Sequence, residues 1–186
     1  AKLPTMSDIA RATGVSRQAV YLHFPGRTDL LVAATRYQDR QNNIDQALAP
    51  SRSARSGTER LDAFVTAWGN YIPNIYGVAR AILAVVDTDP EAAAAWNTRM
   101  ADMREGCAAA VQALAEDGTL PPQTDPEQAT DLLWTILSVR MWENLTQTCG
   151  WDQDCYLATI RGLALAALAQ DVGALTDVLA CPDPPA

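Results

Sequence analysis

Histidine occurs once in the chain, as His23, and no glycine-rich phosphate loop is present. A Ser/His/Asp or Cys/His arrangement needs a histidine beside the nucleophile, and much nucleotide chemistry needs a glycine-rich loop to cradle phosphates. The one histidine lies in a segment whose pattern favours a different role, described below. The sequence therefore predicts that the protein is not an enzyme.

The cysteines lack the pattern of a metal site. They lie at positions 107, 149, 155 and 181, without the short paired spacings of zinc ligands, and His23 is the only imidazole. We therefore expect no metal ion, and no residue pattern indicates a cofactor.

Long hydrophobic runs are absent as well. The longest strongly apolar stretch covers residues 162–169, far fewer than the roughly 20 residues that cross a bilayer as a helix, and no signal peptide is visible. We expect a cytoplasmic protein without a membrane partner.

Alternating runs of β-branched residues are rare, whereas alanine and leucine dominate the composition. Alternation is the pattern of half-buried strands, so its scarcity favours an all-α fold. The 186 residues are enough for one domain, or for a small domain joined to a larger one, with a sizeable core.

Positive charge is concentrated at the start of an otherwise acidic chain. The formal net charge is −8, yet residues 1–40 hold six basic and three acidic residues, and the remainder holds eight basic and nineteen acidic ones. A polyanion would be attracted to the first part and repelled by the rest, which would orient the molecule on DNA. Lys2 is the only lysine, so phosphate contacts would come mainly from arginine.

Residues 6–25 have the pattern of two short helices joined by a tight turn. Thr5 is a good N-cap, and Asp8 could return a hydrogen bond to it, as in a capping box. Gly14 can end the first helix in the left-handed conformation, and Ser16 can cap a second helix that begins at Arg17.

The second helix has one apolar face. Val20 and Phe24 are four residues apart, so we expect them to be buried against the first helix, with Val15 filling the corner between the two. The residues left on other faces are Arg17, Gln18, Ala19, Leu22 and His23, with Tyr21 at the margin. A short helix that presents such side chains after a glycine turn is typical of a helix-turn-helix.

The run T-M-S-D-I-A-R-A-T-G-V-S-R-Q-A-V-Y-L-H-F-P-G-R-T-D-L-L resembles the DNA-binding signature of the TetR/AcrR family of transcriptional regulators. The match covers about residues 5–31 and includes Ile9-Ala10, Gly14-Val15-Ser16, Tyr21, His23-Phe24-Pro25 and Leu30-Leu31. The resemblance implies an N-terminal helix-turn-helix domain followed by a helical domain that binds an effector and dimerises.

Two features depart from the family pattern. Family members carry another helix before this segment, whereas the printed sequence begins four residues before Thr5, so we expect that it omits a preceding segment. Gly26 stands where the family usually has a serine that caps the next helix, and glycine caps only slightly less well.

Side-chain chemistry suggests how the segment would contact DNA. Arg17 can donate two hydrogen bonds to guanine and Gln18 can read adenine, while Ala19 and Leu22 suit thymine methyl groups. Tyr21 and His23 suit phosphates. Arg27 and the caps Thr5 and Ser16 would help to fix the register of the helix on the DNA. The predicted DNA-binding residues are Thr5, Ser16, Arg17, Gln18, Ala19, Tyr21, Leu22, His23 and Arg27.

The rest of the chain is predicted to be helical, with a loop or hinge at residues 50–57. We place the domain boundary there, giving a DNA-binding domain at residues 1–49 and an effector-binding and dimerisation domain at residues 50–186. Pro73 should break or kink the helix that it interrupts. The predicted helices after the helix-turn-helix cover about residues 27–48, 58–72, 74–86, 90–116, 126–148 and 153–170, with a possible short one at 172–180.

The helices at about 126–148 and 153–170 are unusually apolar. A monomer can bury one side of each, and the alternative is that they only complete an internal core. The resemblance implies that they form a four-helix bundle with a second copy, so we expect a homodimer. Their large apolar residues are Leu132, Leu133, Ile136, Leu137, Met141, Tyr156, Leu157, Ile160, Leu163, Leu165 and Leu168.

Aromatic and methionine residues mark the candidate effector pocket that the resemblance implies. The same pattern is also that of an ordinary core, so both interpretations remain open. The candidates are Trp68, Tyr71, Tyr76, Trp96, Met100, Met103, Trp134 and Trp142, and the charged residues that could orient a polar ligand are Arg80, Arg99, Arg140 and Glu143.

The expected function is that of a ligand-responsive, sequence-specific DNA-binding transcriptional regulator. The preferred form is a repressor that a small apolar or aromatic effector releases from a palindromic double-stranded DNA operator. The alternatives are a constitutive DNA-binding protein without an effector, and a transcriptional activator.

Overall fold

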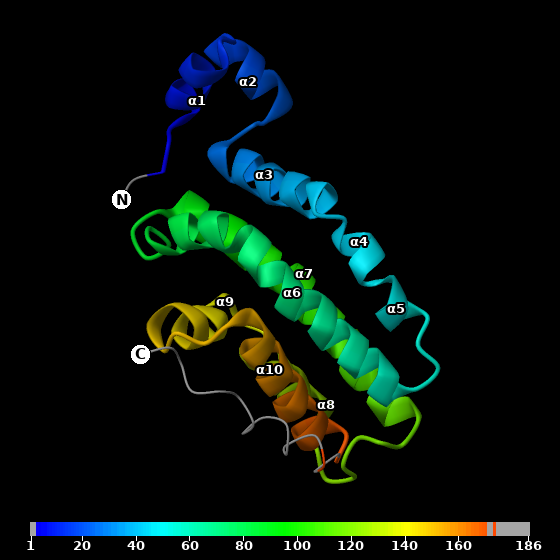
Figure 1. Cartoon of the computed structure of the whole chain (residues 1–186). Helices are drawn as coiled ribbons and strands as arrows, with labels where there is room; N and C mark the ends of the chain where they lie inside the picture. The colour runs from blue at the N-terminus through cyan, green and yellow to red at the C-terminus, as the bar shows by residue number, and fades with distance from the viewer. Residues whose placement is uncertain (1–2, 171–172, 174–186) are drawn as a thin grey trace. The chain divides into compact units, whose positions relative to one another are not determined.

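The described part of the chain is built from helices (Figure 1). The computed structural model describes residues 3–170 and Gly173, and no strand occurs among them, as the composition predicts. The helices are α1 (Met6–Thr13), α2 (Arg17–His23), α3 (Arg27–Gln41), α4 (Ile44–Ala47), α5 (Ala49–Arg52), α6 (Gly57–Leu83), α7 (Pro90–Glu116), α8 (Pro126–Ile136), α9 (Val139–Trp142), the π-helix η1 (Glu143–Thr148) and α10 (Gln153–Leu168).

The helices gather into two compact units that do not follow chain order. The first unit contains the residues up to Asn42 together with Ile75–Asp102, and the second contains Asn43–Asn74 together with the residues from Met103 onward. The first unit therefore combines the helix-turn-helix with the end of α6 and the first half of α7. The predicted boundary between a DNA-binding domain at residues 1–49 and an effector-binding domain at residues 50–186 concerns function, and it stays a prediction.

The helix predicted for residues 27–48 is interrupted. α3 ends at Gln41, and Asn43 adopts the left-handed conformation with φ of 51° before the short helix α4 begins. Asparagine enters this conformation more readily than most residues, because its short polar side chain can bond locally. The predicted loop at residues 50–57 is also partly wrong, since α5 continues to Arg52.

The helix does not break at Pro73, so that part of the prediction is wrong. α6 runs through it from Gly57 to Leu83. Proline has no N–H, so the carbonyl of Gly69, four residues earlier, loses its usual helical donor. The side-chain amide of Gln153 donates to that carbonyl at 2.9 Å, and Gln153 in turn accepts from the indole N–H of Trp142 at 2.9 Å.

α7 begins and ends where the sequence predicts. Pro90 is its first residue, and the carboxylate of Asp89 accepts from the backbone N–H groups of Glu91 and Ala92, each at 3.2 Å. Aspartate followed by proline is a strong signal for the start of a helix. An N–H in the first turn has no helical carbonyl to bond, so proline, which lacks the N–H, loses nothing there.

The helix predicted for residues 126–148 is divided into α8, α9 and η1. Ser138 adopts an extended backbone with ψ of 147°, and its hydroxyl caps α9 by accepting from the N–H of Met141 at 3.1 Å. The last part, η1, is wound as a π-helix. A serine inside an apolar helical pattern therefore marks the restart of a helix here.

The apolar residues of α8 and α10 are shared between a core and a surface. Leu133, Leu137, Ile160 and Leu168 are fully buried in the second unit, whereas 44% of Leu132 is exposed. Met141, Leu157, Leu163 and Leu165 are only partly buried. An internal core thus uses part of the apolar surface of this helix pair, and part of it remains accessible.

None of the helices in the described ranges has the length and apolar composition needed to span a membrane. The short helix expected at residues 172–180 falls outside the described residues except for Gly173.

Candidate nucleic-acid interface

α1 begins at a reciprocal cap. The hydroxyl oxygen of Thr5 accepts from the backbone N–H of Asp8 at 3.2 Å, and the carboxylate of Asp8 accepts from the backbone N–H of Thr5 at 3.0 Å. The Thr5 hydroxyl also donates to that carboxylate at 2.6 Å. These bonds form the predicted capping box and fix the start of the first helix.

Gly14 makes the turn between α1 and α2. It adopts φ of 72°, and its N–H bonds back to the carbonyl of Ala10, as predicted for a glycine after a helix. Val15 does not fill the corner between the helices, because 48% of its side chain is exposed. That prediction is wrong, and the corner is filled instead by residues of the helices themselves.

A small apolar cluster sets the angle of α2. Val20 is buried together with Met6 and Ala10, and Phe24 and Leu30 pack against these three. The inward face of α2 is therefore the one that the sequence predicts. The hydroxyl of Ser16 caps the helix by accepting from the N–H of Ala19 at 3.1 Å.

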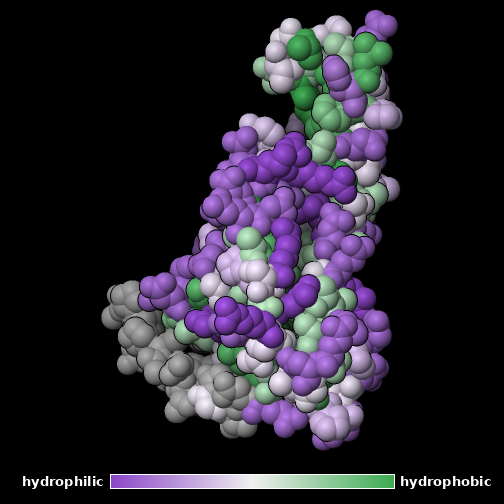
Figure 2. All heavy atoms as spheres, turned by 90° about the vertical axis from the view of Figure 1, so that its right-hand side faces the viewer, coloured by the Kyte–Doolittle hydropathy of each residue, from purple (hydrophilic) through white to green (hydrophobic). Residues whose placement is uncertain are grey.

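The other faces of α2 are open to solvent. Gln18 and His23 are exposed, Ala19 is partly buried, and 79% of Leu22 is exposed. Figure 2 shows hydrophobic residues on the surface of the helix-turn-helix, at the top of the view. Three of the five large exposed hydrophobic side chains in the described structure, Val15, Tyr21 and Leu22, lie in this short segment, so it has the surface of a contact site.

Arg17 stands at the start of α2 without a carboxylate partner among the described residues. Its guanidinium carbon lies 5.3 Å from the centroid of the Tyr21 ring, and one of its nitrogens is 3.5 Å from the Tyr21 hydroxyl. A cation held over an aromatic ring in this way is attracted by the electron-rich face of the ring. Arg17 is thus available to an acceptor outside the chain.

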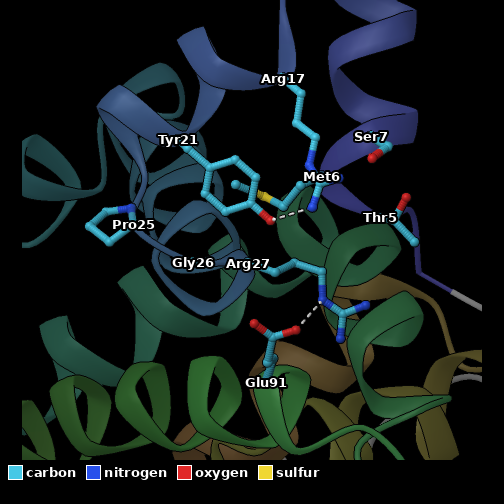
Figure 3. A pocket seen from close by; sticks show the side chains of 9 residues that line it. All are labelled: Thr5, Met6, Ser7, Arg17, Tyr21, Pro25, Gly26, Arg27 and Glu91. Carbon is cyan, nitrogen blue, oxygen red and sulfur yellow. Dashed lines mark hydrogen bonds and ion pairs between the residues drawn. The ribbon is translucent and has the colours of Figure 1, made fainter.

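Four of the predicted DNA-binding residues meet in the wall of one surface cavity of about 350 Å³. They are Thr5, Arg17, Tyr21 and Arg27, and Figure 3 shows their side chains around it. Guanidinium groups and hydroxyls are the donors that bind phosphate oxygens. The full wall consists of Thr5, Met6, Ser7, Arg17, Tyr21, Pro25, Gly26, Arg27 and Glu91.

Arg27 is held by two acidic residues that the sequence did not identify as partners. Its side chain is only 12% exposed, and its guanidinium pairs with Asp89 and, at 3.0 Å, with Glu91. The hydroxyl of Thr28 donates to the backbone carbonyl of Glu91 at 3.3 Å. More than sixty residues separate Arg27 from these partners, so no local spacing could indicate them.

The environment of Asp89 favours its ionised form. Burial acts to raise the pKa of Asp89, but the N–H of Ala92, the hydrogen bond and charge of Arg27 and the N–H of Glu91 together hold the pKa below its ordinary value of 3.8. Asp89 therefore stays charged as a partner of Arg27 and as the cap of α7.

The candidate effector residues are divided between the two units. Trp96 belongs to the first unit and packs on a cluster of Ile82, Val85 and Ala92, and Tyr76 and Met100 are partly buried in the same unit.

In the second unit, Trp68 is buried and makes edge-to-face contacts with Phe64 and with Tyr71, with ring centroids 6.4 and 5.4 Å apart. Met103 and Trp142 are buried, and Trp134 is partly buried with an indole nitrogen that has no hydrogen-bond partner in the described part of the chain.

The charged residues proposed to orient a ligand are partly engaged already. Arg99 pairs with Asp39 at 2.7 Å and with Asp102 at 3.0 Å, and Arg140 pairs with Glu143 at 3.0 Å, whereas Arg80 is exposed.

The comparisons with known proteins agree with this geometry. Residues 4–34 match the family model described as "Bacterial regulatory proteins, tetR family". A crystal structure of a protein from Rhodococcus sp., assigned to the TetR-family transcriptional regulators, is similar with a TM-score of 0.66 and 18% sequence identity, covering 88% of this chain and 87% of that one. No curated protein matches the chain.

Proposed function

We propose that this chain, whose residues 4–34 match the family model of the tetR bacterial regulatory proteins, is a repressor that binds a palindromic operator as a homodimer and is released by a small-molecule effector. DNA-binding transcription regulation is the activity of the family. The repressor role, the operator symmetry, the dimer and the effector are the proposed parts.

The outer face of α2 is the observation that carries the proposal. Leu22 stands 79% exposed on the same short helix as Arg17, which has no acidic partner among the described residues, while Val20 anchors the inner face. In a major groove, Leu22 can cover a thymine methyl group and Arg17 can reach the two acceptors of guanine. Gln18 and Ala19 complete the set that reads bases.

Phosphate contacts would surround this helix. Thr5 and Tyr21 line the same cavity as Arg17, and Ser16 and His23 lie at the two ends of α2. Contacts of this kind fix the position of the helix on the duplex without reading its sequence. Arg27 would join them only by exchanging one of its two acidic partners for phosphate.

A homodimer would supply the second recognition helix. A single seven-residue helix offers too few base contacts for a specific site, whereas two helices can read half-sites about one turn of DNA apart. The accessible apolar side chains of the helices near residues 126–148 and 153–170, such as Leu132 and Leu163, support pairing through this region.

The effector would bind among the aromatic residues of the second unit. Trp68 and Tyr71 form an aromatic pair there, and Trp134 has an indole N–H without a partner among the described residues, which an acceptor on a ligand could use. A coupling of about 1–3 kcal/mol between effector and operator is enough for release.

Footprinting on the DNA upstream of the gene for this protein, at two salt concentrations, tests the proposal. We expect a protected palindrome that persists at the higher salt concentration, because specific contacts survive after non-specific binding has weakened. Small aromatic compounds that raise the unfolding midpoint should then shorten the lifetime of the complex. A chain that protects no DNA segment in preference to any other would contradict the proposal.

A further inference from the structure

The cavity beside the recognition helix contains an acidic residue that a phosphate-binding site would not be expected to have. Glu91 lies in its wall with Thr5, Arg17, Tyr21 and Arg27 (Figure 3). The residue comes from the first turn of α7, far from the helix-turn-helix in sequence. Its carboxylate therefore places a negative charge in a cavity whose other polar side chains could bind a DNA phosphate.

Glu91 and Asp89 hold Arg27 in different ways. Asp89 is 18% exposed and caps α7, so it is part of the structure of that helix. Glu91 is 50% exposed, and its carboxylate contributes only the contact with the Nε of Arg27, at 3.0 Å. Glu91 is thus the partner that can leave without disturbing the helix.

A carboxylate and a phosphate compete for the same guanidinium. Both are anionic acceptors that prefer Arg in nearly the same geometry, and one Arg nitrogen cannot serve both fully. Arg27 directly follows the Pro25-Gly26 turn after α2, within the segment that would face the operator.

We infer that Glu91 is an internal competitor of operator phosphate for Arg27, and that it lowers the DNA affinity of the protein. Binding requires Arg27 to exchange the exposed carboxylate for phosphate, while Asp89 keeps the side chain in place. This inference rests on the proposed function, because it concerns the regulation of the same DNA site.

The test substitution is Glu91→Gln, which keeps the shape of the side chain and removes its charge. The bond from Thr28 to the backbone carbonyl of residue 91 does not depend on the side chain, and Arg27 keeps Asp89 as a partner. Because the Glu91 carboxylate is half exposed and salt screens its charge, we expect Glu91→Gln to bind the protected operator about two- to fivefold more tightly at about 0.15 M salt.

Asp87→Asn is the matched control, because Asp87 is an exposed acidic residue shortly before α7 that makes no ion pair with Arg27. It removes the same charge from the same region, so it measures general repulsion from DNA. We expect it to change affinity by much less than Glu91→Gln does.

A double-mutant cycle identifies the route of the effect. With Arg27→Ala as the background, Glu91→Gln should tighten binding no more than Asp87→Asn does, because the competition acts through Arg27. Equal gains for the two acid substitutions, a gain that persists without Arg27, or weaker binding by Glu91→Gln would each overturn the inference. A wild-type chain that shows no preference for any operator would instead contradict the proposed function.

Discussion

The side-chain amide of Gln153 donates to the backbone carbonyl of Gly69, the carbonyl that Pro73 leaves without a helical donor. Gly69 also permits the close approach, since a Cβ there would lie 2.7 Å from Leu157 and 2.9 Å from Ile160. Gln153 is oriented by the indole of Trp142. Three elements of the second unit thus cooperate to let α6 continue through a proline.

Gln153→Leu should destabilise the protein by about 1–3 kcal/mol, because it removes the side-chain donor to the carbonyl of Gly69 and the amide oxygen that accepts from the indole of Trp142, both in a partly buried place. Denaturant unfolding, followed by circular dichroism, measures the change. Gln128→Leu, on an exposed position of α8, is the control and should have little effect.

Pro73→Ala tests the reason for this cost. An alanine at position 73 supplies the N–H that the Gly69 carbonyl lacks, so Gln153→Leu should cost less in the Pro73→Ala background than in the wild type. An unchanged cost would show that Gln153 stabilises the unit in another way.

Local signals predicted the helix-turn-helix in detail. Thr5, Gly14 and Ser16 act within three or four residues along the chain, and each occupies the cap or turn position that its chemistry favours. Val15 is the exception, because whether a corner side chain is buried depends on how closely two helices approach. The periodicity of Val20 and Phe24 predicted the inward face for the same local reason.

Contacts between residues that are far apart in the sequence could not be predicted from such local patterns. The continuation of α6 through Pro73 could not be predicted, because the donor that replaces the missing N–H comes from Gln153, 84 residues from Gly69. The partners of Arg27 were missed because Asp89 and Glu91 are both remote from it in sequence. The effector site stays a prediction, since the pattern of its aromatic residues also describes a core.

Gly57→Ala should destabilise the protein, because the new Cβ would lie 2.6–2.7 Å from backbone atoms of Ala113 and Leu114, which cannot rotate away. A cost of at least about 1 kcal/mol is expected for such overpacking. Gly77→Ala is the matched substitution on the same helix, where nothing lies within 4 Å, and it should stabilise by about 0.5–1 kcal/mol. Thermal unfolding of the two variants should therefore shift in opposite directions.

Asp117 should make stability depend on acid. The hydroxyl of Thr119 and the backbone N–H of Gly57 donate to its carboxylate and hold the pKa of Asp117 below its ordinary value of 3.8. Because the folded pKa is the lower one, the contribution to stability is fully present above that ordinary value and is lost as the pH falls through the folded pKa.

The difference in unfolding midpoint between wild type and Asp117→Ala should therefore be large at neutral pH and shrink as the pH falls below the ordinary value of 3.8. Asp87→Ala, at an exposed position, is the control. A difference that stays constant with pH would show that Asp117 acts through packing and not through its charge.

Arg17→Ala should weaken discrimination between the operator and random DNA by about 1–3 kcal/mol, the usual value of a bidentate base contact. The fold should be unaffected, since Tyr21 is the only polar or aromatic partner of the Arg17 side chain among the described residues. Competition titrations with a labelled operator and unlabelled random duplex measure the ratio.

Arg55→Ala is the matched control for Arg17→Ala, because Arg55 is an exposed arginine of the second unit and its removal changes the net charge equally. It should leave the ratio of operator to random affinity unchanged. Equal losses of Arg17→Ala on both DNAs would assign Arg17 to phosphate contacts, and base reading would then have to come from Gln18, Ala19 and Leu22 alone.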